Sequence, residues 1–283
     1  MIQNSFIHMQ GVGKSTEEKL WNRGITNWSL YEEAHSKGEK LPMAGTMMRS
    51  IDTSRRHYEK GDLLHFQGLL PAGEAWRLFP EFQESTCYLD IETTGDGHWC
   101  DITTIALYDG KTVRTYVNGE NLDDFKGDIT AYATVVTYNG KSFDIPVIRR
   151  VMGIPMEMAH IDLRYVLGSL GIKGGLKRCE EILGLGRTDL AGVDGYAAVV
   201  MWNQYKKTGE RRYLETLLAY NVADTVNMEP LLVEACRMRR DTIPEGARFT
   251  LPATGNPATP HIPDHGVIEE MRRLHRSSQG NQW

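Results

Sequence analysis

The chain has 283 residues, a formal net charge of −5 at pH 7 and an ordinary hydrophobic fraction of 41%. This length allows one large domain or two smaller ones, and the negative balance means that any binding of nucleic acid needs local basic patches. No apolar run is long enough to span a membrane, and the first residues do not form a secretory signal. The four cysteines form no Cys-x-x-Cys pair, so we expect reduced thiols and a cytoplasmic location.

Residues 5–34 contain a compact pattern centred on Gly11-Val12-Gly13. The glycines allow a tight turn. Ser15 or Thr16 is placed to cap a following helix, and Gly24 is placed to end it.

Two interpretations of this turn involve phosphate. Gly13-Lys14-Ser15 does not complete a nucleoside triphosphate loop, because His8 occupies the position of the first required glycine, so no nucleotide cofactor is expected. The segment instead resembles a helix-hairpin-helix motif. That resemblance implies that Gly11, Gly13 and Lys14 hold a nucleic-acid phosphate, since amides at a helix N-terminus are unpaired donors. The alternative is a packing turn in a small helical subdomain.

The next part of the chain, up to residue 85, is predicted to be mainly helical, with helices over 47–58, 63–69 and 74–82. It includes a modest basic cluster, for which a solvated helix face is the usual explanation: Arg49, Arg55, Arg56, His57 and Lys60.

Residues 86–91 predict a short buried strand that ends in two acids, Asp90 and Glu92. Side chains two apart on a strand point to the same face. Two carboxylates on one buried face repel each other and are costly to desolvate, and a bound hard cation such as Mg²⁺ or Mn²⁺ relieves both costs. The alternative is a strand end where both acids meet water.

A hairpin with its turn at Asp109-Gly110 is predicted over 102–108 and 111–117, followed by a strand over 133–137. Asp144 then opens a helix that continues to residue 151, with Phe143 and Ile145 beside it. Asp162 is best explained as a helix cap.

Three further helices are predicted over 174–184, 193–205 and 212–239. Tyr220 and Asp224 are four residues apart in the last of these, so they share one helical face.

Three of these stretches together resemble the ribonuclease-H-like 3′–5′ exonucleases with four acidic ligands, the DEDD superfamily. Asp90-Ile91-Glu92-Thr93-Thr94-Gly95 is similar to the first motif, and Asn139-x-x-x-Phe143-Asp144 is similar to the second. Tyr220-x-x-x-Asp224 is similar to the third motif in its tyrosine variant, DEDDy. The resemblance covers roughly residues 86–236, and within the superfamily the chain is most similar to the YprB-like ribonuclease-H-like domain proteins.

The resemblance implies an α/β fold with a mixed sheet flanked by helices. It implies a two-metal-ion site for Mg²⁺ or Mn²⁺ in which Asp90, Glu92, Asp144 and Asp224 are the ligands, and Tyr220 orients the attacking water. The implied substrate is DNA or RNA with a free 3′ end. The residues expected to contact nucleic acid in this region are Thr94, Gly95, Asn139, Phe143 and Lys177.

We therefore expect a helical region over 1–70, a ribonuclease-H-like domain over 71–240 and a proline-rich tail over 241–283 with a short helix at 267–276. The tail is either extended chain on the surface or flexible. The functional hypothesis is a metal-dependent 3′–5′ exonuclease. The alternatives are endonucleolytic or structure-specific cleavage at the same site, and a nucleic-acid-binding protein with a lapsed site.

Overall fold

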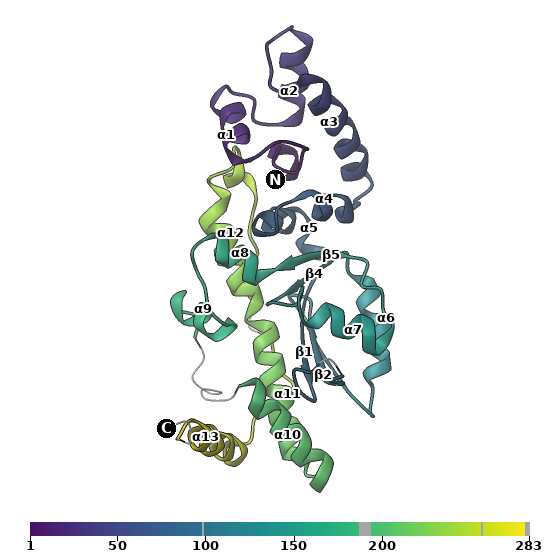
Figure 1. Ribbon diagram of the computed structural model, residues 1–283, viewed down its shortest axis with the longest axis vertical. Coiled ribbons are helices and arrows are strands. Elements are labelled where there is room, and N and C mark those ends of the chain that lie inside the picture. The colour runs from purple at the N-terminus through teal and green to yellow at the C-terminus, as the bar shows by residue number, and fades with distance from the viewer. Residues whose placement is uncertain (98, 187–193, 256, 281–283) are drawn as a thin grey trace.

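The computed structural model describes residues 1–97, 99–186, 194–255 and 257–280. The molecule is elongated, with an N-terminal helical region at one end and helices α10 (Gly195–Thr208) and α13 (His265–Gly280) at the other (Figure 1). Residue 193, the first of the helix predicted over 193–205, lies outside the described residues. Within the described chain, no helix combines the length and apolarity needed to cross a membrane.

A five-stranded sheet forms the centre, in the order β3-β2-β1-β4-β5. The first three strands form an antiparallel meander, and β4 and β5 continue parallel to β1. This mixed sheet between helices confirms the α/β prediction. The strands are β1 (Thr86–Thr93), β2 (Ile102–Tyr108), β3 (Val113–Val117), β4 (Thr134–Thr137) and β5 (Ala159–Asp162).

The hairpin between β2 and β3 begins its second arm two residues later than predicted. The Asp109 carboxylate accepts the N–H groups of Lys111 and Thr112 at 3.0 and 2.7 Å. These two residues therefore belong to the turn, because an aspartate side chain can replace ladder hydrogen bonds at such a position.

The two faces of β1 pack against different helices. Cys87, Leu89 and Ile91 lie in one core with α7 (Asp144–Met152), whereas Tyr88 belongs to the core that contains α12. Alternation along the strand therefore places Asp90 and Glu92 on the face of Tyr88. The remaining helices of the sheet region are α6 (Phe125–Asp128), α8 (Leu163–Ser169), α9 (Leu176–Ile182), α11 (Arg211–Val226) and α12 (Met228–Arg240).

The single helix predicted over 212–239 is wrong, because the structure has α11 and α12 in succession with a break at Asn227. Pro230 explains the break. Proline has no N–H to donate to the carbonyl four residues earlier, here Val226, and its ring crowds that carbonyl, so it is tolerated only in the first turn of a new helix.

The helix predicted over 74–82 is also only partly correct. Residues Ala72–Leu78 form a 3₁₀ helix, and α5 (Phe79–Phe82) follows with Pro80 in its first turn. Trp76, Leu78 and Phe79 are buried as expected.

The N-terminal region contains α1 (Lys14–Asn22), α2 (Trp28–Ser36), α3 (Ala44–Glu59) and α4 (Leu63–Leu69). The cap prediction for α1 is wrong, since Gly13 is the N-cap residue and no side chain caps the helix. Ser15 and Thr16 are already inside the first turn.

A buried ionic network attaches this region to the rest of the chain. The Glu17 carboxylate accepts hydrogen bonds from Arg77 at 2.9 and 3.0 Å and from the N–H groups of Phe6 and Ile7. Arg77 also donates to Glu74 at 2.9 Å. Both carboxylates and the guanidinium are almost fully buried, so Arg77 compensates the charge of Glu17, whereas Glu74 also pairs with Lys14 at 2.6 Å and with Arg239 at 3.3 Å.

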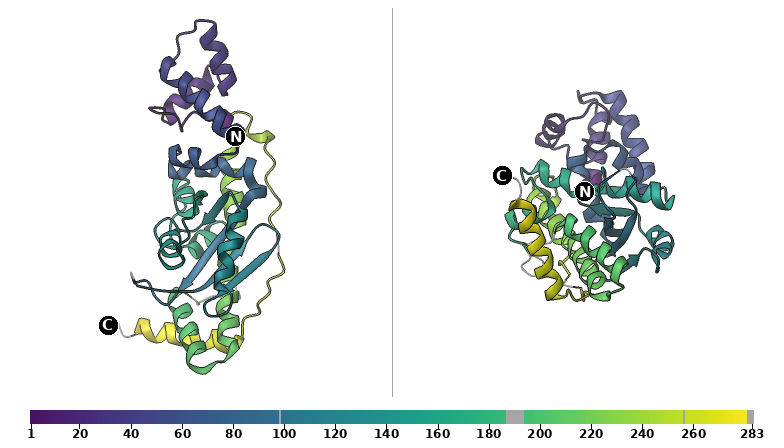
Figure 2. Two further views of the ribbon diagram at one scale, coloured as in Figure 1. Left: turned by 90° about the vertical axis from the view of Figure 1, so that its right-hand side faces the viewer. Right: turned by 60° about the horizontal axis from the view of Figure 1, so that its bottom comes forward.

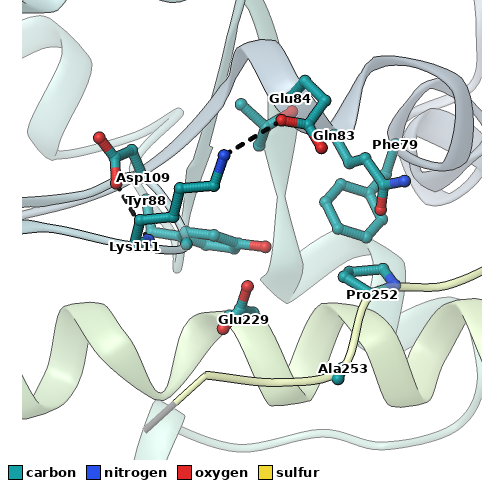
Figure 3. Close-up of a pocket in the computed structure, with 11 residues that line it drawn as sticks. Phe79, Gln83, Glu84, Tyr88, Asp109, Lys111, Glu229, Pro252 and Ala253 are labelled. Atoms are coloured by element: carbon teal, nitrogen blue, oxygen red, sulfur yellow. Dashed lines mark hydrogen bonds and ion pairs between the residues drawn. The ribbon is translucent and has the colours of Figure 1, made fainter. Parts of the chain in front are cut away.

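The C-terminal segment runs in an extended conformation along the molecule before α13 (Figure 2). Glu229 of α12 holds it by accepting the N–H of Gly255 at 2.9 Å and the hydroxyl of Tyr108 at 3.0 Å. Figure 3 shows Pro252 and Ala253 crossing near Glu229 at the edge of a small pocket of about 190 Å³. Of the two alternatives for this segment, the structure favours chain packed on the surface.

Candidate metal centre

Three carboxylates from two elements meet at the end of β1. Asp90 and Glu92 come from the strand and Asp224 from α11, and one oxygen of each lies within 4.8 Å of the others. Their burial and mutual repulsion raise the pKa of Asp90 and of Glu92 well above the ordinary range. Hard oxygen ligands at this spacing suit a divalent cation of the Mg²⁺ or Mn²⁺ type.

Asp144 lies beside this group, at the first position of α7. It is buried, and its carboxylate accepts the N–H of Ile91 at 3.3 Å, which fixes it against the strand between the two other acids. Burial raises the pKa of Asp144 to about 7. Its charge also contributes to the raised pKa of Asp90 and Glu92, so the four acids act on one another electrostatically.

Tyr220 lies one helical turn before Asp224 and is buried. Burial, followed by the negative charges of the nearby acids and a hydrogen bond to Asp224, raises the pKa of its hydroxyl far above the ordinary value. The Nζ atom of Lys177 lies 4.6 Å from the centre of the Tyr220 ring, and its positive charge offsets part of the rise in the pKa of Glu92. The phenol is therefore protonated at neutral pH and acts as a hydrogen-bonding group.

Asn221 is a site residue that the sequence analysis did not identify. Its side-chain N–H donates to Asp90 Oδ2 at 2.7 Å, and its carbonyl oxygen accepts the Thr104 hydroxyl of β2 at 3.1 Å. Asn221 is completely buried. The sequence offered one signal, an asparagine within an apolar helical stretch directly after Tyr220. A buried amide at such a position needs specific hydrogen-bond partners.

A cavity of about 420 Å³ opens next to Glu92. Two of the residues expected to contact nucleic acid, Gly95 and Phe143, line it together with Tyr196 of α10. Tyr196 was not predicted as a site residue, and it is 64% exposed.

Two other expected contacts are engaged elsewhere. The Thr94 hydroxyl accepts the N–H of Asp101 at 3.0 Å. Asn139 adopts a left-handed backbone conformation, and its side chain accepts hydrogen bonds from Ser142 and Arg164. These bonds assign Asn139 a turn-forming role in the structure.

Asp162 caps α8 as predicted. Its carboxylate accepts the N–H of Arg164 at 3.0 Å, and it also accepts the N–H groups of Asn139 and Lys141 at 2.8 and 3.0 Å. Asp162 thus anchors the loop that leads to Asp144.

The remaining expected contacts lie at the start of α1, a helix in the part of the molecule opposite α10 (Figure 1). Gly11 has φ +78°, which a glycine adopts freely, and an added Cβ would lie 2.6 Å from Met43. Lys14 forms an ion pair with Glu74 at 2.6 Å. The turn leads directly into α1, but only a 3₁₀ turn at Ile2–Asn4 precedes it.

Comparison with protein families decides the classification of the central region. A family model described as the RNase H superfamily matches residues 87–236, which is more than half of the chain. The chain belongs to the RNase H superfamily. All four acids, Tyr220 and Asn221 lie inside this RNase H domain, and the match agrees with the resemblance over 86–236.

No curated protein matches the chain. A family B DNA polymerase from the hyperthermophilic archaeon Pyrobaculum calidifontis is similar in structure, with a TM-score of 0.41 and 15% sequence identity. The match covers 69% of this chain and 29% of the polymerase, so the chain spans less than a third of that protein.

Proposed function

We propose that the protein is a metal-dependent nuclease, and more specifically a 3′–5′ exonuclease of the DEDDy type similar to the YprB-like proteins. The observation that carries this proposal is the convergence of Asp90, Glu92 and Asp224 within 4.8 Å, with Asp144 and Tyr220 beside them. Membership of the RNase H superfamily supports a nuclease-type function.

The close carboxylates repel one another, and a divalent metal ion between them would relieve that repulsion. Oxygens of Asp90, Glu92 and Asp224 lie within 4.8 Å of one another, and burial with mutual repulsion raises the pKa of Asp90 and Glu92. Asp90, Glu92 and Asp224 would hold the metal, and Asp144 would contribute from its position beside Ile91. When bound, Mg²⁺ or Mn²⁺ lowers the pKa of a water and stabilises negative charge on phosphate oxygens.

The other side chains prepare this centre. Asn221 holds Asp90 in one orientation through a hydrogen bond of 2.7 Å. Tyr220 keeps its proton, so its role would be to orient the attacking water through the hydroxyl and not to remove a proton from it. Lys177 offsets part of the negative charge at Glu92 and packs on the Tyr220 ring.

The cavity beside Glu92 supports cleavage at the end of a nucleic-acid strand. Its volume of about 420 Å³ is of the size that holds a single small ligand, and Phe143 and Tyr196 provide apolar ring surface in its lining. A terminal nucleotide placed there would bring its phosphodiester to the acids, with its base against aromatic rings.

The test is a cleavage assay with end-labelled single-stranded and double-stranded DNA and RNA, with Mg²⁺, with Mn²⁺ and with chelator. We expect products that shorten from the 3′ end and that disappear with chelator, with Asp90→Asn and with Asp224→Asn. Asp123→Asn, which changes an exposed acid outside the site, is the matched control and should retain activity.

Internal cuts would establish an endonuclease on the same acids instead. Binding of these substrates without cleavage under every condition would exclude both forms of nuclease.

A further inference from the structure

A polar pocket of about 260 Å³ lies in the N-terminal region, between α3, α4 and the segment around residue 8. Thr46, Ser50 and Thr53 of α3 line it, together with Arg49. These positions are three and four apart and therefore share one helical face. Met47 and Ile51 of the same helix are buried. The helix thus presents a row of hydroxyl groups and one guanidinium to the pocket.

Two imidazole nitrogens at the pocket lack partners. His8 is only 2% exposed, and its Nε2 atom lies 3.0 Å from the Ser54 hydroxyl, but its Nδ1 atom is buried without a hydrogen bond. The Nε2 atom of His65 is also buried without one. Unpartnered buried polar atoms are uncommon in folded proteins, and a bound group that completes their hydrogen bonding is one explanation.

The charges around the pocket favour an anion. None of its lining residues is a carboxylate, although the chain has a net charge of −5. Arg49 forms no hydrogen bond or ion pair with another residue of the described chain. Its neighbours on α3 differ, because Arg55 pairs with Glu32 at 2.6 Å and Arg56 pairs with Asp52 at 2.8 Å.

The hydrogen-bond donors around the pocket indicate which kind of anion it would bind. Burial lowers the pKa of His8 to about 3, so its ring is neutral and carries one N–H. When Ser54 donates to Nε2, the proton of His8 is on Nδ1, which is then a donor without a partner. A guanidinium, several hydroxyls and an imidazole N–H match the tetrahedral acceptor oxygens of phosphate.

We propose that this pocket binds a phosphate group. The phosphate comes either from the backbone of a nucleic-acid strand, a source that rests on the proposed nuclease function, or from a free nucleotide. In both cases Arg49 pairs with the charge, and the α3 hydroxyls and the two histidines complete the hydrogen bonds. Met9 and Gln10 line the pocket, whereas Gly11, Gly13 and Lys14 do not, and Lys14 pairs with Glu74.

The experiment measures binding to the full chain in chelator, so that no divalent metal at the acidic centre contributes. The probes are inorganic phosphate, a nucleoside 5′-monophosphate and a labelled single-stranded oligonucleotide. We expect Arg49→Ala to weaken binding at least tenfold and Ser50→Leu, which fills the pocket, to abolish saturable binding. Arg55→Ala, which removes the ion pair with Glu32, is the matched control on the same helix, and we expect it to change affinity less than twofold.

The outcomes separate the two sources. Binding of the monophosphate with this variant pattern identifies a free nucleotide, whereas binding of the oligonucleotide alone identifies the strand backbone. The proposal is overturned if no probe binds saturably to the unaltered protein, or if Arg55→Ala loses as much affinity as Arg49→Ala. Because cleavage is assayed separately with Mg²⁺, a protein that binds through Arg49 but does not cleave would refute only the nuclease function. Circular dichroism of each variant checks that it is folded.

Discussion

Replacement of Asn221 by alanine tests whether the acidic centre depends on a residue that does not itself need to contact metal. The substitution removes the 2.7 Å hydrogen bond to Asp90 Oδ2 and leaves the buried Thr104 hydroxyl without the acceptor that lies 3.1 Å from it. Asp90 would then rotate more freely. We expect Asn221→Ala to bind Mg²⁺ or Mn²⁺ more weakly and to cleave more slowly at low metal concentration.

The magnitude follows from the type of bond that is lost. A hydrogen bond to a charged group contributes about 1.5–3 kcal/mol. Because about 1.4 kcal/mol corresponds to a factor of ten, this loss predicts an increase of roughly 10–100-fold in the metal concentration needed for half-maximal activity. Partners that orient metal ligands affect affinity by about the same factor, 10–100-fold.

The assay is a titration of the protein with Mg²⁺ or Mn²⁺, in which calorimetry measures metal binding and the initial rate of cleavage measures activity. Asn227→Ala is the matched control, since Asn227 lies at the end of the same helix and donates to Glu180 at 3.0 Å, away from the acids. A shift in the metal titration for Asn221→Ala but not for Asn227→Ala supports the positioning role. An unchanged titration in folded Asn221→Ala refutes it.

Three further predictions concern Tyr220, Arg77 and His8. Tyr220→Phe should lower the cleavage rate by about 100-fold at saturating Mg²⁺, while calorimetry shows metal binding unchanged; a normal rate would remove the water-orienting role. Arg77→Ala should lower the free energy of unfolding in urea by about 3–5 kcal/mol, because the buried charge of Glu17 loses its ion-pair partner, and Arg248→Ala at an exposed ion pair should change it by less than about 1 kcal/mol. His8 has a folded-state pKa of about 3, below the ordinary value of 6.5, so the unfolded chain takes up the proton first and stability falls as pH decreases below 6.5. Between pH 6.5 and 4 the unaltered protein should lose roughly 3 kcal/mol more stability than His8→Phe, and equal acid sensitivity of the two proteins would contradict this.

Local patterns were sufficient for much of the sheet and for one half of the acidic centre. Alternation along β1 depends only on neighbouring residues, so Asp90 and Glu92 could be placed on one face from the sequence. The helices over 63–69 and 144–151 were likewise predictable from apolar spacing and turn residues. The association of Asp144 and Asp224 with the strand required the family resemblance, because no local rule brings together residues more than 50 positions apart.

The predictions that were wrong involve competition between local signals. The apolar spacing over 212–239 continues through Pro230, and the missing N–H of that proline decides that the helix breaks. Ser15 and Thr16 are good caps, yet the chain enters α1 at Gly13, whose extended backbone needs no side-chain acceptor in order to begin the helix. In both cases the sequence contained the deciding residue, but two signals of similar strength pointed to different boundaries.

The acidic centre and the pocket of the N-terminal region are subject to one physical requirement, because each contains a buried polar side chain. Asn221 and His8 both occupy positions from which water is excluded, and a polar group at such a position lowers stability unless its hydrogen bonds are completed. For Asn221 the partners are inside the chain, Asp90 and Thr104, and the bond to Asp90 places it beside the acidic centre. For His8 one partner, Ser54, is inside the chain, and the second nitrogen has none. The same physical requirement that assigns Asn221 to the site therefore assigns the unsatisfied nitrogen of His8 to a group from outside the chain, and Arg49 indicates that this group is an anion.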